Sequence, residues 1–153
     1  MQESRAIAAG EAPPDGSWSE VGRWTITDPN SLTAIRRGVT DAVRPRVIRA
    51  AGARSMVRRS ADAAERLSLV TGELAANGLR HALPPITVAL SFSEGFWLVV
   101  VSDHPSYGRP VLREPDSEGG IGLHLVLAVS EHVGWHMSGT TRCVWAVVGA
   151  TAV

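Results

Sequence analysis

Two apolar stretches joined by a tight turn constrain the fold of this chain more than any other feature. In residues 86–92, apolar side chains alternate with small or polar ones, which is typical of a strand with one buried face. Glu94 and Gly95 predict a short hairpin turn, and residues 96–102 (FWLVVVS) then form a strand that is apolar on both faces. Because a short hairpin joins antiparallel neighbours, the sheet cannot be all-parallel.

The spacing of apolar residues predicts the other elements. From residue 32 the period is helical, and Pro45 should break or kink that helix because proline lacks the amide hydrogen. The predicted order is strand 21–27, the interrupted helix from 32, helix 60–82, strands 86–92 and 96–102, helix 123–131, and strands 132–138 and 142–148. We therefore expect an α+β two-layer sandwich, with a mixed, mostly antiparallel sheet of about five strands and about three helices on one face.

Length and composition indicate one cytosolic domain. The 153 residues suit a single core, which we place at residues 20–150, after a mobile tail over residues 1–19 that is rich in proline, glycine and polar residues. A single cysteine excludes an internal disulfide framework. No apolar run approaches the ~20 residues of a membrane span, and residues 1–16 lack a signal core. We therefore expect a cytoplasmic protein without a membrane partner.

The basic residues are all arginine, which narrows the chemistry. Without lysine, a Schiff base and a phosphate loop of the GxxxxGK[ST] kind are excluded. Residues 30–66 hold nine arginines and only three acidic residues, so this segment could meet nucleic acid or an acidic partner. No aromatic residue is interleaved with them, which favours a solvated helix face and leaves nucleic-acid binding as the weakest hypothesis.

Residues 69–81 (LVTGELAANGLRH) predict a helix with polar groups on one side. Glu73, Asn77, Arg80 and His81 follow one another at spacings of four, three and one, next to an apolar stripe. A carboxylate here could orient or deprotonate an attacking hydroxyl or water, and the Asn77 oxygen suits Mg²⁺. A solvated helix surface would explain the same residues, so the helix alone does not define a site.

Two further segments contribute candidate groups. Asp103 ends the most apolar strand, where its carboxylate could accept a hydrogen bond from an amino group such as adenine's or simply cap a turn. Residues 103–120 form a long loop of the kind that often covers a ligand. Gly119, Gly120 and Gly122 open the next helix and could bring backbone amides close to a phosphate, although a flexible hinge would look the same.

Together these segments resemble the histidine-kinase-like ATPase superfamily, whose Bergerat fold is shared by gyrase, the heat-shock chaperone of the ninety-kilodalton class and MutL. The resemblance covers roughly residues 21–148. It is carried by ELAANGLRHA at 73–82, similar to the family's ELxxNAxxHA helix, by GGIGL at 119–123, which matches its second glycine box, and by VWAVV at 144–148, similar to its last strand. The short single-domain form looks like the anti-sigma factor serine kinases and their actinobacterial relatives.

The resemblance implies a role for each candidate residue. Glu73 would be the general base, Asn77 would hold Mg²⁺ and Asp103 would contact the adenine amino group. The first glycine box departs from the family pattern and reads DHPSYG. The other nucleotide-site residues implied are Arg80 and His81 near the phosphates, Gly108, Gly119, Gly120, Gly122 and Leu123 in the glycine boxes, and Cys143, which stands where the family usually has threonine.

The same resemblance implies a function and its partners. The chain would bind ATP and Mg²⁺, bind a sigma factor or an anti-sigma antagonist, and phosphorylate the antagonist on serine by direct transfer from ATP. The alternative is a non-catalytic partner-binding module of the same fold with a degenerate pocket. Relatives of this form are often dimers through the first helix and strand, which leaves a homodimer open.

Overall fold

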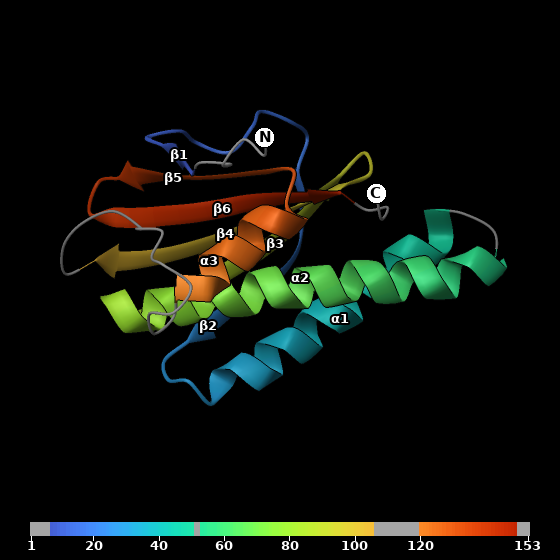
Figure 1. The fold of residues 1–153 in the computed structure, drawn as a ribbon, viewed down its shortest axis with the longest axis horizontal. Coiled ribbons are helices and arrows are strands. Elements are labelled where there is room, and N and C mark those ends of the chain that lie inside the picture. Colours follow the sequence, from blue (N-terminus) through green and yellow to red (C-terminus); the bar gives the residue numbers. More distant parts are fainter. Residues whose placement is uncertain (1–6, 51–52, 106–119, 150–153) are drawn as a thin grey trace.

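A sheet and a layer of helices make up the molecule (Figure 1). The computed structural model describes residues 7–50, 53–105 and 120–149. Its elements are β1 (Ala8–Ala9), β2 (Ser19–Ile26), α1 (Ser31–Ala50), α2 (Ala53–His81), β3 (Ala82–Ser93), β4 (Phe96–Pro105), α3 (Gly120–Val129), β5 (His132–Ser138) and β6 (Thr141–Gly149). The strand order is β1-β5-β6-β4-β3-β2, with β1 parallel to β5 and the other neighbours antiparallel. The expected α+β sandwich is confirmed.

The predicted hairpin forms the centre of the sheet. Glu94 and Gly95 make its turn with positive φ values of 45° and 85°, and the strands that they join, β3 and β4, pair antiparallel. β4 lies between β3 and β6, so both of its edges are paired. Trp97, Val99 and Val101 point into the main core, whereas Leu98 belongs to a second cluster on the other face. A strand apolar on both faces is therefore central, as its sequence predicts.

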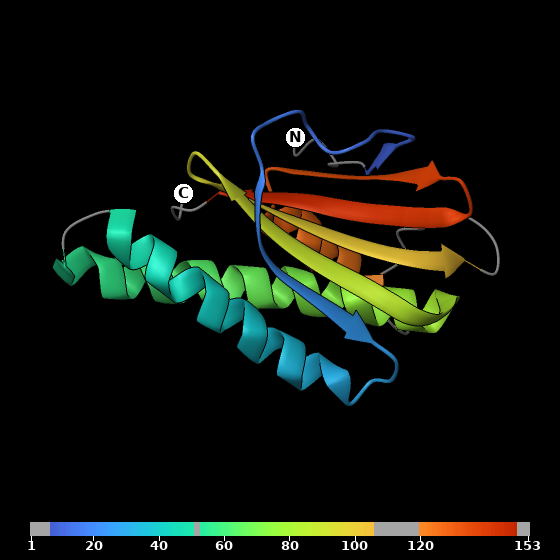
Figure 2. The ribbon, with the colours of Figure 1, turned by 180° about the vertical axis from the view of Figure 1, so that it is seen from behind.

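The three helices cover one face of the sheet, and α2 crosses its middle (Figures 1 and 2). The predicted apolar stripe of α2 provides this packing, because Leu67, Val70 and Leu74 are all buried in the main core. The side chains on the opposite side of α2 do not take part in this packing and can make other contacts. Of the helices in the described ranges, none is long and apolar enough to cross a bilayer.

The N-terminal segment lies on the other face, where Figure 2 shows it crossing the sheet. β1 pairs with β5, and the indole Nε1 of Trp145 donates a hydrogen bond of 2.7 Å to the backbone oxygen of Glu11. Trp18 packs against the second cluster of Leu98, Trp145 and Val147. We expected residues 1–19 to form a mobile tail. Residues 1–6 lie outside the described part of the chain, whereas β1 and Trp18 of this segment lie against the sheet.

The helical hairpin is longer than its sequence predicts. α1 continues through Pro45 to Ala50, so of the break or kink expected at Pro45 the break does not occur. Pro45 and Asp41 are both exposed, and water can therefore bind the Asp41 carbonyl that the missing amide leaves free. α2 begins at Ala53 and not at Ser60, because the alanine and arginines before Ser60 are good helix formers. Together α1 and α2 extend beyond the sheet (Figure 1).

Substitution by alanine should have opposite effects on stability at two glycines of this hairpin. A Cβ at Gly38 would lie 2.7 Å from the Nε1 of Trp24, a ring packed against the core, so Gly38→Ala should lower the free energy of unfolding by about 1–3 kcal/mol. A Cβ at Gly72 would meet only the guanidinium end of exposed Arg36. Gly72→Ala should therefore stabilise the helix by up to about 1 kcal/mol. Urea unfolding of both variants checks the pair, and equal effects would contradict this packing.

Candidate functional site

The predicted site lies where α2 meets the first turn of α3. A Cβ added at Gly122 would overlap Oε2 of Glu73 and lie 3.0 Å from its Cδ. The carboxylate of Glu73 therefore rests against the backbone of α3, at a position where only glycine fits without displacing it. The structure brings together two residues that the sequence assigns to the base and to the second glycine box.

The end of β4 approaches the same helix about one turn further on. A Cβ at Gly78 would lie 3.2 Å from Oδ2 of Asp103 and 3.2 Å from Cδ1 of Ile86. The carboxylate of Asp103 is thus seated against α2 beside Asn77. Three elements that are distant in sequence converge here, as the site requires.

The other predicted residues of α2 have different environments. Asn77 follows Glu73 by one turn and is buried, with 7% of its surface exposed. Arg80 is exposed. The side chain of His81 lies outside the described residues, as do Gly108 and Gly119. The described polar groups on this part of α2 are therefore Glu73, Asn77 and Arg80.

Two of the predicted nucleotide-site residues lie elsewhere. Gly120 begins α3 as expected, but the side chain of Leu123 is buried in the main core. Cys143 lies on the outer face of the sheet, where its Sγ is 3.6 Å from the Oγ of Ser102. Successive side chains of a strand point to opposite faces, so Cys143 faces away from Asp103. The placement of Cys143 in the pocket is wrong.

Arg142 takes the position that Cys143 was expected to fill. Its register partner across the sheet is Asp103, and the guanidinium donates from Nε to Oδ1 and from Nη2 to Oδ2, each at 3.0 Å. The two side chains are only 2% and 1% exposed. This is a buried, bidentate ion pair.

A signal for Arg142 was present in the sequence. Val144, Ala146 and Val148 face the main core, and Arg142 is in phase with them at the two-residue period of a strand. Cys143, the neighbour of Arg142, has the opposite phase and therefore points away from the core. The two-residue period of the strand thus identifies Arg142 as the inward-facing residue.

The described groups match the chemistry of a magnesium nucleotide. Asn77 offers a side-chain oxygen, the donor that Mg²⁺ prefers, one turn after the Glu73 carboxylate that would act as base. The missing Cβ of Gly122 leaves the start of α3 close to them, and a helix start attracts phosphate. The residues present therefore fit the ion and its phosphates.

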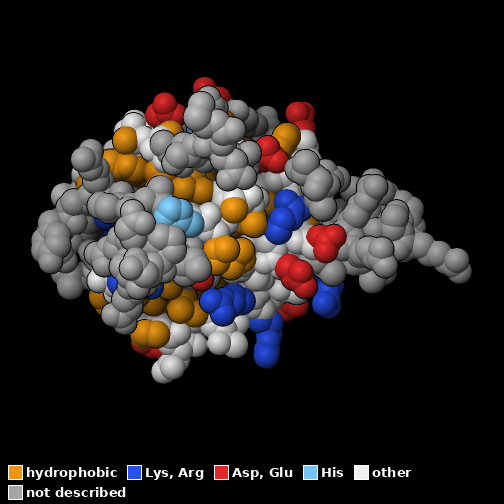
Figure 3. Space-filling model, in the orientation of Figure 1, with side chains coloured by type: hydrophobic (Ala, Val, Ile, Leu, Met, Phe, Trp, Pro, Cys, Tyr) orange, Lys and Arg blue, Asp and Glu red, His pale blue; other side chains and the backbone are white. Residues whose placement is uncertain are grey.

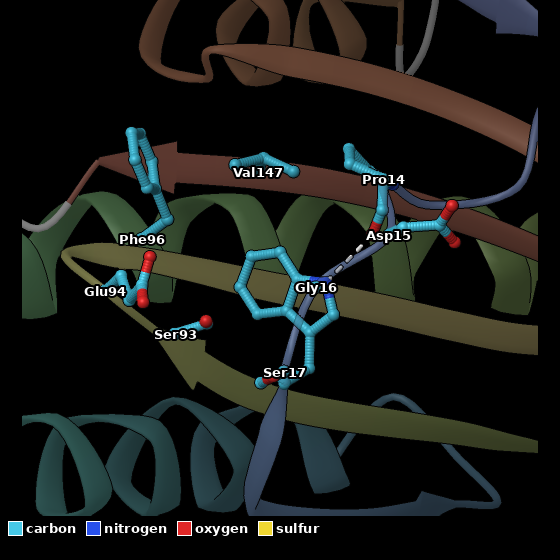
Figure 4. Close-up of a pocket in the computed structure, with 9 residues that line it drawn as sticks. Pro14, Asp15, Gly16, Ser17, Ser93, Glu94, Phe96 and Val147 are labelled. Atoms are coloured by element: carbon cyan, nitrogen blue, oxygen red, sulfur yellow. Dashed lines mark hydrogen bonds between the residues drawn. The ribbon is translucent and has the colours of Figure 1, made fainter.

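A separate pocket of about 530 Å³ lies on the outer face of the sheet (Figure 4). It is formed by the N-terminal segment and the β3–β4 hairpin, with the indole of Trp18 held by a 2.9 Å hydrogen bond to the Pro14 backbone oxygen. Phe96, 43% exposed, stands on the hairpin side. The sheet separates this pocket from Glu73 and Asn77, so it is not part of the predicted site.

Charges of both signs are mixed on the helical face (Figure 3). On α1, Arg36, Arg37 and Arg44 are exposed together with Asp41, and α2 adds exposed Glu65. The described part of the arginine-rich segment therefore carries both signs of charge at its exposed positions, whereas Arg66 is partly buried, with Nε and Nη2 without a hydrogen-bond partner among the described residues.

Comparison with known families now identifies the domain. The family model of the histidine kinase-like ATPase domain matches residues 27–148, and the chain belongs to this family. Among solved structures, the Acinetobacter baumannii histidine kinase AdeS is similar, with a TM-score of 0.44 and 11% identity over 81% of this chain and 76% of that chain. A search of curated proteins finds no match.

Proposed function

We propose that this domain binds ATP with Mg²⁺ and transfers the terminal phosphoryl group to a serine of a partner protein. The observation that carries the proposal is the approach of Glu73 to Gly122, which places a carboxylate of α2 at the start of α3. Membership of the histidine kinase-like ATPase family supports nucleotide binding at this position. The domain would be an ATP-dependent regulator.

Each residue of the site would have a separate task. Glu73 would accept the proton of the attacking serine hydroxyl, which requires a carboxylate within hydrogen-bond reach of that oxygen. Asn77 would hold Mg²⁺ through its side-chain oxygen, and Gly120 and Gly122 would let backbone amides approach the phosphates. Arg80, exposed one turn after Asn77, would add positive charge near them.

Bound Mg²⁺ would neutralise charge on the transferred phosphoryl group. The contribution of the protein is then mostly position, because phosphoryl transfer requires little covalent chemistry from side chains. This division of tasks makes the orientation of Glu73 the feature most sensitive to small displacements.

The proposed partners are a sigma factor and an anti-sigma antagonist in the cytoplasm, with the serine on the antagonist. Incubation of the domain with radiolabelled ATP and candidate antagonist proteins tests the transfer, and co-purification with sigma factors tests the binding. Label on a serine of one antagonist would support the proposal. Label on no candidate, with intact ATP binding, would remove the kinase part of it.

A second candidate function is a non-catalytic module that only binds a partner. The buried pair of Asp103 and Arg142 favours it, because Arg142 already donates a hydrogen bond to each oxygen of the proposed adenine-binding carboxylate, which is 1% exposed. Binding of a sigma factor that is unchanged by ATP, ADP or chelation of Mg²⁺ would support the module over the kinase.

Gly122→Ala should impair phosphoryl transfer without unfolding the domain. The added Cβ displaces only the end of the Glu73 side chain, which is flexible, while alanine favours the helix. A displacement of about 1 Å at a reacting group can cost roughly 100-fold in rate, and we expect a loss of that order. Transfer rate and thermal unfolding are measured on the same preparation.

Gly72→Ala is the matched control, because its added Cβ meets the guanidinium of Arg36 and not the carboxylate of Glu73, although Gly72 directly precedes Glu73 in α2. It should leave the transfer rate unchanged. Equal rates for wild type and Gly122→Ala would show that Glu73 need not occupy its present position.

A further inference from the structure

The structure assigns Arg142 a function at the proposed nucleotide site. We propose that Arg142 competes with the purine amino group for Asp103 and so lowers the affinity of the site for adenine nucleotides. This inference rests on the nucleotide site proposed above, and it adds a residue that sets how tightly the base is held.

The competition follows from the number and kind of hydrogen bonds. Arg142 donates one bond to each oxygen of Asp103, both at 3.0 Å and both between charged groups. Charge-assisted bonds are stronger than bonds from a neutral donor such as a purine amino group. A purine that arrives at this carboxylate therefore offers a weaker partner than the one already present.

Access to Asp103 leads to the same conclusion. The carboxylate is 1% exposed, and α2 borders it at Gly78, whose Cβ position lies 3.2 Å from Oδ2. On the next strand of the sheet, the guanidinium of Arg142 approaches both oxygens. Of these neighbours, the arginine is a long side chain that can change rotamer, whereas Gly78 presents helix backbone. A purine can therefore reach Asp103 by displacing Arg142.

Removal of the guanidinium should consequently improve binding. A threonine at position 142 is too short to reach Asp103 with two donors, so the side of the carboxylate that the guanidinium now covers would be open to the purine. The gain distinguishes this function from a purely structural one, because loss of a structural contact lowers stability but does not create affinity for a ligand.

Calorimetric titration with Mg²⁺ and ATP tests the proposal on the full chain. Arg142→Thr should bind ATP at least about tenfold more tightly than wild type, which is the effect of one charge-assisted hydrogen bond. Titration with purine riboside triphosphate, which carries hydrogen in place of the amino group, should show no such gain. Arg23→Thr makes the same change in an exposed pair of β2 and should leave both affinities unchanged.

The outcomes separate this inference from the proposed function. Wild type that binds ATP as tightly as Arg142→Thr would overturn the inference and leave the function in place. Tighter binding by Arg142→Thr, while wild type does not bind at millimolar ATP, would support the inference and overturn ATP binding as the natural function. An equal gain for ATP and purine riboside triphosphate would overturn the base contact.

A second variant covers the case in which Arg142→Thr does not fold. Arg142→Gln keeps most of the side-chain volume but can donate to only one oxygen at a time, so it should also bind ATP more tightly than wild type. Arg142→Lys keeps the charge without the planar fork, so its affinity for ATP should lie between that of wild type and that of Arg142→Gln. The reverse order of affinities would overturn the proposal.

Discussion

Arg142→Ala is expected to lower the free energy of unfolding by about 3–5 kcal/mol, because it leaves the Asp103 carboxylate buried without its partner. The two side chains are 2% and 1% exposed, so water cannot replace the lost hydrogen bonds without rearrangement of the core. In a domain of this size the change should lower the melting temperature by roughly 6–20 °C. Urea and thermal unfolding both measure it.

The exposed pair on β2 provides the control. Arg23 donates from Nε to Oε1 of Glu20 at 3.0 Å, with side chains that are 58% and 46% exposed. Glu20 raises the pKa of Arg23 through this hydrogen bond, but the solvent screens the pair. Arg23→Ala should therefore cost at most about 1 kcal/mol.

A double variant distinguishes the contribution of the ion pair to stability from that of the volume that its two side chains fill. Asp103→Leu with Arg142→Met replaces both charges by apolar groups of similar length, and such exchanges are often neutral or stabilising. We expect this variant to be more stable than Arg142→Ala. A single variant as stable as wild type would mean that the ion pair does not form in the folded protein.

Glu73→Gln is expected to slow phosphoryl transfer by about 10²–10⁴-fold, because glutamine has the shape of glutamate but cannot accept the proton of the serine hydroxyl. ATP binding should remain within about threefold of wild type, because the proposed contacts to the nucleotide come from other residues. Single-turnover transfer and nucleotide titration measure the two quantities independently.

Glu65→Gln makes the same change on an exposed face of α2 and should have no effect on transfer. Transfer by Glu73→Gln at the wild-type rate would refute Glu73 as the base. Loss of ATP binding in this variant would instead indicate a role in holding the nucleotide.

The sequence predicted the fold well where the side-chain period was decisive. Alternation and the Glu94–Gly95 turn placed the central hairpin, and the apolar stripe of α2 identified its buried face. The ends of the helices were predicted less well, because Pro45 lies on a solvent-exposed turn where its cost is small. β1 has only two residues, too few for any periodic signal.

The sequence predicted most of the residues that form the site but not the ion pair between two of its strands. The spacing of Glu73 and Asn77 gave a polar face, and Gly122 gave the close approach of α3 that the structure contains. The pair of Asp103 and Arg142 was missed because it joins two strands that are far apart in sequence. A pairing of this kind depends on register, which local patterns do not determine.

Titration of the wild-type chain with ATP, with and without Mg²⁺, tests the central claim most directly. The account predicts saturable binding that requires Mg²⁺ and is lost in Asn77→Ala, because the side-chain oxygen of Asn77 would hold the ion. Asn30→Ala, at an exposed turn, should bind as wild type does. Failure of the wild-type chain to bind ATP or ADP at millimolar concentration would contradict it.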